Sequence, residues 1–204
     1  DSAVAVELDG IRIAPLICED VWHVEPAASA RRAGADLCIA MNASPYQQGK
    51  QPEREENIAL RVRETGMPFV YLNLVGGQDE LVFDGHSFAV DAGGRVVHRA
   101  PAFEESLSCV DVTLGEGPAR IEPESLAPLL ELEASVYRAI VTAVRDYVGK
   151  NHFSNVVLGL SGGGLTRQLG HLAADLPGYR ANIRTKIADV RGAGSACAAF
   201  SAEL

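Results

Sequence analysis

The chain has 204 residues, of which 47% are hydrophobic and 22% charged, so it can bury a full core as one domain or slightly more. Its formal net charge of −9 disfavours a nucleic-acid partner, because phosphate binding requires a basic surface. We expect neither a signal peptide nor a membrane span, since no apolar run approaches the ~20 residues that a membrane helix needs. The chain begins at Asp1, just ahead of a predicted strand, so we expect a fragment of a longer protein.

The first elements predict a hairpin that leads to a cysteine. Two β-rich runs, residues 4–8 and 11–17, flank Asp9-Gly10, and both turn residues tolerate positive φ. The second strand delivers Cys18 to its carboxyl end, where α/β folds expose their chemistry. Cys18 is therefore a candidate nucleophile. The alternative is a buried free cysteine that behaves as a small hydrophobe.

The next part of the chain predicts a mixed α/β layer structure rather than a pure βαβ array. The predicted elements, in chain order, are a helix at 25–32, a strand at 37–41, a helix at 52–64, a strand at 69–74, a hairpin of 88–91 and 95–99, and a strand at 107–112. The second helix has Pro52 at its start and Gly66 just past its end, which is the usual asymmetry of helix boundaries.

Composition changes at residues 114–128, which contain three Pro, two Gly and three Glu without periodicity, and we interpret them as a linker. Residues 129–148 are the clearest predicted helix. Its apolar stripe consists of Leu132, Val136, Ile140, Val144 and Tyr147. A buried strand is predicted at 156–160, and the sequence after Leu165 has no convincing period.

A cysteine nucleophile needs a nearby base or cation, because only the thiolate attacks. The carboxylates of Glu19 and Asp20 disfavour a thiolate, so the positive group must come from elsewhere in the fold. Lys50 follows the polar loop at 42–46 and is a candidate for contact with substrate or charge. The alternative is a solvated surface lysine. Four scattered cysteines (the others are Cys38, Cys109 and Cys197) show no metal-binding spacing, so no metal ligand set is predicted and a reducing cytoplasm fits best.

Three motifs stand at predicted strand-to-loop junctions: Ile-Cys-Glu-Asp-Val-Trp at 17–22, Asn-Ala-Ser-Pro-Tyr at 42–46, and the stretch at 71–85. Their order and spacing, over roughly the first half of the chain, resemble the nitrilase-type glutaminase domain of glutamine-dependent NAD synthetases. The resemblance implies a partial αββα sandwich in which a Glu-Lys-Cys triad hydrolyses glutamine and releases ammonia.

The same resemblance implies roles for four residues. Cys18 resembles the nucleophile, Ser44 and Lys50 stand where the family contacts glutamine, and Glu19 is close to the oxyanion and the amide. The base Glu and the Lys of the family lie upstream of the cysteine. Upstream of Cys18 this sequence offers only Glu7, in the hairpin, and no Lys, so the triad is incomplete in this chain.

A glycine loop follows the predicted strand at 156–160, and such a loop lets backbone N–H groups approach phosphate oxygens. It resembles the start of the family's ATP-pyrophosphatase-type α/β synthetase domain, whose loop reads Ser-Gly-Gly-hydrophobic-Asp-Ser. The implied nucleotide-binding residues are Gly159, Ser161, Gly162 and Gly163. The match ends at Gly164. An ordinary turn is one alternative, and a G-x-S-x-G nucleophile elbow is another, which the upstream linker and long helix do not fit.

The sequence therefore predicts a truncated carbon-nitrogen hydrolase domain at 1–113, a linker at 114–128, the start of a synthetase domain at 129–163, and a tail of unrecognised origin at 164–204. The resemblance implies that the full enzyme hydrolyses glutamine through a thioester on Cys18. With ATP and Mg²⁺ it would then use the ammonia to convert deamido-NAD to NAD, in the cytoplasm and as a homo-oligomer. The alternatives are a stand-alone amidase or nitrilase and a catalytically inactive remnant.

Overall fold

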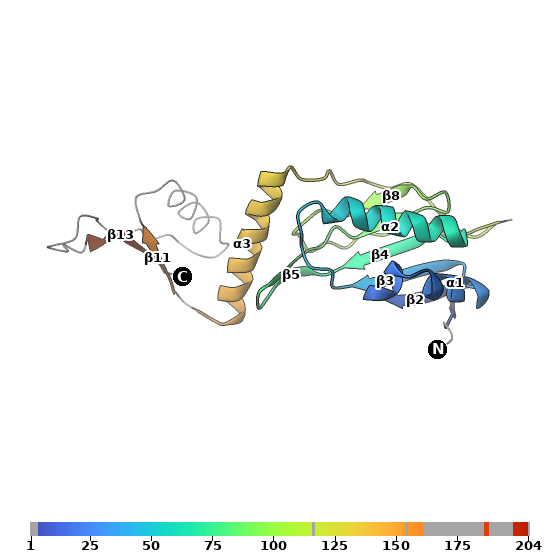
Figure 1. The fold of residues 1–204 in the computed structure, drawn as a ribbon, viewed down its shortest axis with the longest axis horizontal. Coiled ribbons are helices and arrows are strands. Elements are labelled where there is room, and N and C mark those ends of the chain that lie inside the picture. Colours follow the sequence, from blue (N-terminus) through green and yellow to red (C-terminus); the bar gives the residue numbers. More distant parts are fainter. Residues whose placement is uncertain (1–3, 116, 154, 161–185, 188–197, 204) are drawn as a thin grey trace. The chain divides into compact units, whose positions relative to one another are not determined.

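The computed structural model describes residues 4–115, 117–153, 155–160, 186–187 and 198–203, and from residue 155 onward it describes only the backbone of strands. The chain divides into two compact units, each described separately below (Figure 1). The first unit comprises Asp1–Gly76 and Leu81–Ala139, and the second comprises Gly77–Glu80 and Ile140–Leu204.

The first unit is built on a six-stranded mixed sheet whose strand order is β1-β2-β3-β4-β7-β8. The strands are β1 (Val6–Leu8), β2 (Ile11–Ile17), β3 (Leu37–Asn42), β4 (Phe69–Asn73), β7 (Phe88–Val90) and β8 (Val96–Arg99). Strands β2, β3 and β4 are parallel, and every other pair in this sheet is antiparallel. The carboxyl ends of the three parallel strands therefore meet at one edge of the sheet.

Local sequence chemistry fixes the hairpin and the helix ends as predicted. β1 and β2 pair antiparallel across Asp9 and Gly10, whose φ angles are 50° and 83°. The predicted helices are confirmed as α1 (Val24–Arg32) and α2 (Lys50–Thr65). Gly66 closes α2 in the left-handed conformation, with its N–H donating to the carbonyl of Val62 at 2.7 Å.

The main core lies between α1, α2 and one face of the sheet, and Figure 1 shows α2 running along that sheet. Its central members are fully buried apolar side chains: Ala14, Ala30, Ala40, Ile58, Val62, Phe69, Tyr71 and Val90. Because side chains alternate along a strand, Leu37 and Cys38 face opposite sides, and only Cys38 belongs to this core. The arrangement is one helix layer on one sheet, which fits part of the expected four-layer sandwich.

The opposite face of the sheet is covered by the segment that follows β8, and here most of a predicted strand is missing. The strand expected at 107–112 is reduced to β9 (Val112–Thr113), and Leu107 is 97% exposed. The expected linker at 114–128 contains β10 (Arg120–Ile121), which pairs with β9 and buries Ile121 against the sheet. Residues 124–127 also hydrogen-bond to β8. Backbone pairing with an existing edge overrides the Pro- and Gly-rich composition of this segment.

A second hairpin follows β4, in a segment where the sequence predicts no strand. β5 (Val75–Gln78) and β6 (Leu81–Asp84) form a two-stranded sheet around a turn that places Asp79 at φ 50°. The sequence does not indicate β5 as a strand because two of its four residues are glycines, which have low strand propensity.

Helix α3 (Leu132–Lys150) confirms the predicted long helix but not its buried stripe. Leu132, Ile140 and Tyr147 are 51%, 46% and 56% exposed, whereas Ala139, Thr142 and Val148 are buried. The sides of α3 that face the protein therefore carry mainly small residues. The compact units divide within this helix rather than in the segment 114–128.

In the second unit, β11 (Asn155–Leu160) confirms the strand predicted at 156–160. It pairs antiparallel with β13 (Ala198–Glu203), which also pairs with β12 (Lys186–Ile187). Throughout the described part of the chain, no helix combines the length and the apolar character needed to cross a membrane.

Candidate active site

The candidate site lies at the edge where the parallel strands end. Cys18 directly follows β2, the loop with Ser44 follows β3, and Asn73 is the last residue of β4. Adjacent strands are in register at this edge, since Ile17 pairs with Met41 and Asn42 pairs with Asn73. The sheet thereby brings Cys18 and Asn73, which are 55 positions apart in the sequence, to the same edge, on either side of β3.

Cys18 is held in a conformation that a non-glycine residue rarely adopts. Its φ angle is 49°, and it begins the short 3₁₀ helix η1 (Cys18–Trp22) immediately after the extended Ile17. The turn is locked because the N–H of Ile17 donates to the Asp20 carboxylate at 2.8 Å. The thiol is exposed, unlike that of Cys38, which lies in the core. This combination of backbone strain and exposure is typical of a functional residue.

A hollow of about 360 Å³ opens beside Cys18. Its lining brings together all four residues predicted for the first site, and it adds others that the sequence did not single out. The lining residues are Cys18, Glu19, Trp22, Asn42, Ala43, Ser44, Pro45, Gln47, Lys50 and Glu53. Cys18, Glu19, Ser44 and Lys50 thus share one hollow, while their chemical roles stay predictions.

Lys50 supplies the cation of this hollow. It was expected in a turn before the helix, but α2 begins at Lys50, after Gly49 in the left-handed conformation. Its Nζ lies 2.8 Å from Glu53 Oε1 and 4.5 Å from the centroid of the Trp22 ring. The side chain is 20% exposed, so the aromatic face and the carboxylate orient it without removing it from solvent.

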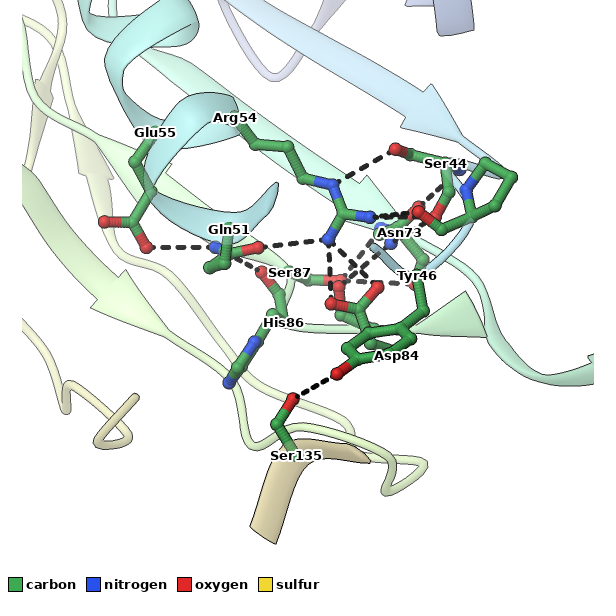
Figure 2. A network of polar contacts seen from close by, with 12 residues as sticks. Ser44, Tyr46, Gln51, Arg54, Glu55, Asn73, Asp84, His86, Ser87 and Ser135 are labelled. Atoms are coloured by element: carbon green, nitrogen blue, oxygen red, sulfur yellow. Dashed lines mark hydrogen bonds and ion pairs between the residues drawn. The ribbon is translucent and has the colours of Figure 1, made fainter. Parts of the chain in front are cut away.

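The loop that carries Ser44 rests on a buried arginine of α2, as Figure 2 shows. Arg54 donates from Nε to Ser44 Oγ at 3.1 Å and from Nη2 to the carbonyls of Ser44 and Pro45, both at 3.0 Å. Its Nη1 lies 2.9 Å from each carboxylate oxygen of Asp84 and 3.3 Å from Gln51 Oε1. The charge is thereby compensated inside the protein.

Asn73 fixes the same loop from the side of the sheet. Its Oδ1 accepts the N–H of Ser44 at 2.9 Å, and its Nδ2 donates to the carbonyls of Ser44 and Gly85 at 3.3 and 3.1 Å. Further along the loop, the hydroxyl of Tyr46 accepts a hydrogen bond of 3.0 Å from the hydroxyl of Ser135 (Figure 2). The Ser44 loop is therefore held at several points by groups that are themselves part of the folded core.

Tyr71 places a phenol beneath this network. Burial raises the pKa of Tyr71, while Arg54 and the hydroxyl of Ser44 act in the opposite direction. The hydroxyl is nevertheless beyond hydrogen-bonding geometry from every described residue. We therefore count Tyr71 as a neighbour of the site and not as a member of the hydrogen-bond network.

Sequence reasoning missed Glu53, Arg54, Asn73 and Asp84. One signal was present, since Glu53 and Arg54 stand three and four positions after Lys50 and share its helix face once the helix begins at Lys50. For Asn73 and Asp84 the only sign was their place within the motif at 71–85. Their role depends on contacts with a loop and a helix about 30 residues away, which local patterns do not reveal.

The comparisons with known proteins agree with this geometry. A family model described as carbon-nitrogen hydrolase matches residues 1–119, more than half of the 204 residues. The chain belongs to the carbon-nitrogen hydrolase family. The nitrilase-like α/β fold expected from the three motifs is therefore confirmed for this part of the chain.

Within this family, the chain is similar to proteins named glutamine-dependent NAD(+) synthetase. It is 42% identical over 176 residues to the one from Rhodobacter capsulatus, covering 83% of this chain and 32% of that relative. It is 46% identical over 166 residues to the one from Xylella fastidiosa strain Temecula1, covering 79% and 30%. The chain thus spans about a third of the length of these relatives.

A solved structure gives the same result. The glutamine-dependent NAD⁺ synthetase from Acinetobacter baumannii in complex with ADP superimposes with a TM-score of 0.70 at 32% identity, over 76% of this chain and 29% of that one. The resemblance inferred from the three motifs is therefore confirmed.

The second predicted site is described only in part. Gly159 lies in β11, whereas Ser161, Gly162 and Gly163 lie outside the described residues. Among the residues that the structure describes, no group of three or more His, Cys, Asp or Glu side chains is placed to hold a metal ion.

Proposed function

We propose that the chain is part of a glutamine-dependent NAD synthetase and that its hollow beside Cys18 binds glutamine for hydrolysis. The observation that carries the proposal is the convergence of an exposed thiol, a hydroxyl and a cation, from Cys18, Ser44 and Lys50, on one hollow. A small amide that also carries a carboxylate suits this set, because the carboxylate can bind the cation and the hydroxyl while the amide carbon faces the thiol.

In the proposed reaction, the sulfur of Cys18 attacks the side-chain carbonyl carbon of glutamine. The carbon–nitrogen bond then breaks, the nitrogen takes a proton and leaves as ammonia, and the acyl group stays on sulfur as a thioester. Water hydrolyses the thioester to glutamate and restores the thiol. The thiol proton requires a base, which the resemblance places upstream of the cysteine. We therefore expect this chain alone to release little ammonia from glutamine.

The test is protection of Cys18 from alkylation. Iodoacetamide modification of Cys18 is followed by peptide mass spectrometry with increasing glutamine, and Cys109, which is also exposed, serves as the internal reference thiol. We expect glutamine to slow modification of Cys18 and not of Cys109, and glutamate to protect less. No protection by glutamine would refute the proposal. Protection by short aliphatic amides alone would favour a stand-alone amidase.

We further propose that the ammonia serves an ATP-dependent amidation of deamido-NAD in the full enzyme, which would act in the cytoplasm as a homo-oligomer. The support is the family resemblance at Gly159, Ser161, Gly162 and Gly163. When bound, ATP and Mg²⁺ would supply activation of the acid to be amidated. The loop lacks the family's Asp, and Leu165 stands in its place, so we expect only weak ATP binding by this chain. Tight Mg²⁺-dependent binding in titration calorimetry would contradict that expectation.

A further inference from the structure

We infer that Arg54 is a positioning residue for ligand binding, which fixes the hydroxyl of Ser44 as a hydrogen-bond donor into the hollow beside Cys18. The inference rests on the proposed function, because it names the group that the Ser44 hydroxyl meets as an acceptor oxygen of the bound glutamine. It concerns a residue that does not line the hollow itself, because Arg54 hydrogen-bonds to Ser44 and Pro45, which do (Figure 2).

The contacts of Arg54 use its whole donor set. Its side chain is 0% exposed, and its five N–H groups are directed at Ser44 Oγ, the carbonyls of Ser44 and Pro45, the Asp84 carboxylate and Gln51 Oε1. Three of these contacts hold the Ser44–Pro45 backbone and side chain, and the others compensate or orient the guanidinium. A buried cation with this many partners has one geometry only, so the loop it holds has one geometry as well.

The direction of the Ser44 hydroxyl is limited by which of its neighbours can accept a hydrogen, and the oxygen of Tyr71 is the protein acceptor that competes with a ligand in the hollow. Ser44 Oγ accepts the Nε–H of Arg54 at 3.1 Å, and an arginine side chain has no acceptor, so the hydroxyl hydrogen must point elsewhere. The Ser44 N–H is already donated to Asn73. Since Ser44 lines the hollow together with Lys50, a donor and a cation face the same space. Both recognise an oxygen with negative or partial negative charge.

A lysine cannot replace Arg54 in this arrangement. An ammonium group is a point charge with three donors, so it can compensate Asp84 but cannot reach Ser44 Oγ and the two loop carbonyls in the same plane. Arg54→Lys therefore keeps the buried charge while it releases the Ser44 hydroxyl. Arg61 provides a matched control on the same helix. It is also buried, its Nε lies 3.2 Å from Glu64 Oε2, and it has no hydrogen bond to the Ser44 loop.

The first measurement is the apparent dissociation constant of glutamine, obtained from protection of Cys18 against iodoacetamide. We expect Arg54→Lys and Ser44→Ala each to raise the apparent dissociation constant of glutamine by roughly 3- to 10-fold, which is the effect of one hydrogen bond. The double variant should bind glutamine no more weakly than the single variant with the lower affinity, because Arg54 acts through Ser44. Arg61→Lys should stay within about twofold of the wild type. The rate at which iodoacetamide alkylates Cys18 without glutamine should be unchanged in Arg61→Lys.

A second measurement does not depend on glutamine. Iodoacetate carries a carboxylate and iodoacetamide does not, so the ratio of their rates at Cys18, referred to the same ratio at Cys109, reports recognition of an anionic oxygen beside the thiol. We expect the ratio of the iodoacetate rate to the iodoacetamide rate to be lower than in the wild type in Arg54→Lys and in Ser44→Ala, and to equal the wild-type value in Arg61→Lys. Failure of glutamine to protect the wild type would refute the proposed function, and this ratio would still decide the role of Arg54.

Four results would overturn the inference. Ser44→Ala with wild-type glutamine affinity and rate ratio would show that the hydroxyl does not meet the ligand, for example because it turns toward Tyr71 instead. Losses that multiply in the double variant would show that Arg54 does not act through Ser44. Equal losses in Arg61→Lys would mean that any buried arginine of α2 matters equally. If Arg54→Lys alone of the variants failed to fold, the role of Arg54 would be purely structural.

Discussion

The guanidinium of Arg54 and the carboxylate of Asp84 form a buried ion pair, with Nη1 of Arg54 lying 2.9 Å from each oxygen of Asp84. The two side chains are 0% and 5% exposed. Arg54 belongs to α2 and Asp84 ends β6, so the pair joins the helix to the hairpin directly behind the Ser44 loop. The structure of the candidate site therefore depends on a charge that is compensated outside the hollow.

Breaking this pair should be costly. We expect Asp84→Asn to lower the free energy of unfolding by roughly 3–5 kcal/mol, because it leaves the buried guanidinium without a counter-ion. Glu56→Gln is the matched control, since the Arg63–Glu56 pair is 51% and 76% exposed and surface pairs contribute about 1 kcal/mol or less. Urea denaturation of both variants measures the difference. Equal destabilisation by the two substitutions would contradict this view of the pair.

Gly85 and Gly66 allow backbone strain to be separated from steric crowding. Their φ angles are 66° and 67°, so an alanine at either position bears the same left-handed penalty, about 1–2 kcal/mol. A Cβ at Gly85 would lie 2.5 Å from Val75 Cγ2, whereas a Cβ at Gly66 would meet nothing within 4 Å. We expect Gly85→Ala to be the more destabilising by roughly 1–3 kcal/mol in denaturant unfolding. Similar values for the two variants would show that Val75 yields without cost.

His86 should make the stability of the fold depend on pH. Burial lowers the pKa of His86 below its ordinary 6.5, outweighing the nearby carboxylates of Asp84 and Glu55. The unfolded state therefore binds the proton first. Stability is fully present above about pH 6.5 and is lost as the pH falls below that value, by at most ~1.4 kcal/mol per pH unit for one proton.

The control for this prediction is His23, whose side chain is 67% exposed. We expect His86→Gln to flatten the decline in unfolding free energy between pH 7 and pH 5, and His23→Gln to leave it unchanged. Asp36 and Asp91 do not interfere. Their pKa values are lowered below the ordinary 3.8, Asp36 mainly by its hydrogen bond with Arg12, so their contributions are lost only at more acidic pH. A decline that persists in His86→Gln would assign it to another group.

The described cysteines should differ sharply in reactivity. Burial raises the pKa of the Cys38 thiol to about 12, while Cys18 and Cys109 are exposed. At pH 8 we expect iodoacetamide to modify Cys18 and Cys109 in the native protein and Cys38 only after addition of denaturant, because the thiolate is the reactive form. Peptide mass spectrometry assigns each site. Native-state modification of Cys38 would mean that the core opens readily between α1, α2 and the sheet.

Much of the local structure was predictable because its cause lies in neighbouring residues. Asp9 and Gly10 adopt the positive φ angles that a two-residue hairpin turn requires, and Gly66 ends α2 in the left-handed conformation that glycine favours. The position of Cys18 at the end of β2 followed from the apolar run before it. These features need no information from distant parts of the chain.

Other features failed at the sequence level because they depend on distant partners. The segment 107–112 has a composition that suits a strand, but only its last residue forms part of one, β9. Residues 124–127 have a composition that does not suit a strand, and yet they hydrogen-bond to β8. The exposed stripe on α3 shows the same limit. Apolar periodicity locates a helix, but the neighbouring elements decide which of its sides is buried.

The sequence by itself determined the family, the strand that presents Cys18, and the identity of Ser44 and Lys50 as its companions, because motif order and turn chemistry are written in consecutive residues. Only the tertiary structure decided how these residues are held. The sequence shows only that Arg54 stands one helical turn after Lys50, and its burial depends on Asp84, 30 positions away. A charge enters a protein core only where the fold supplies partners for it, and those partners come together only when the sheet has formed.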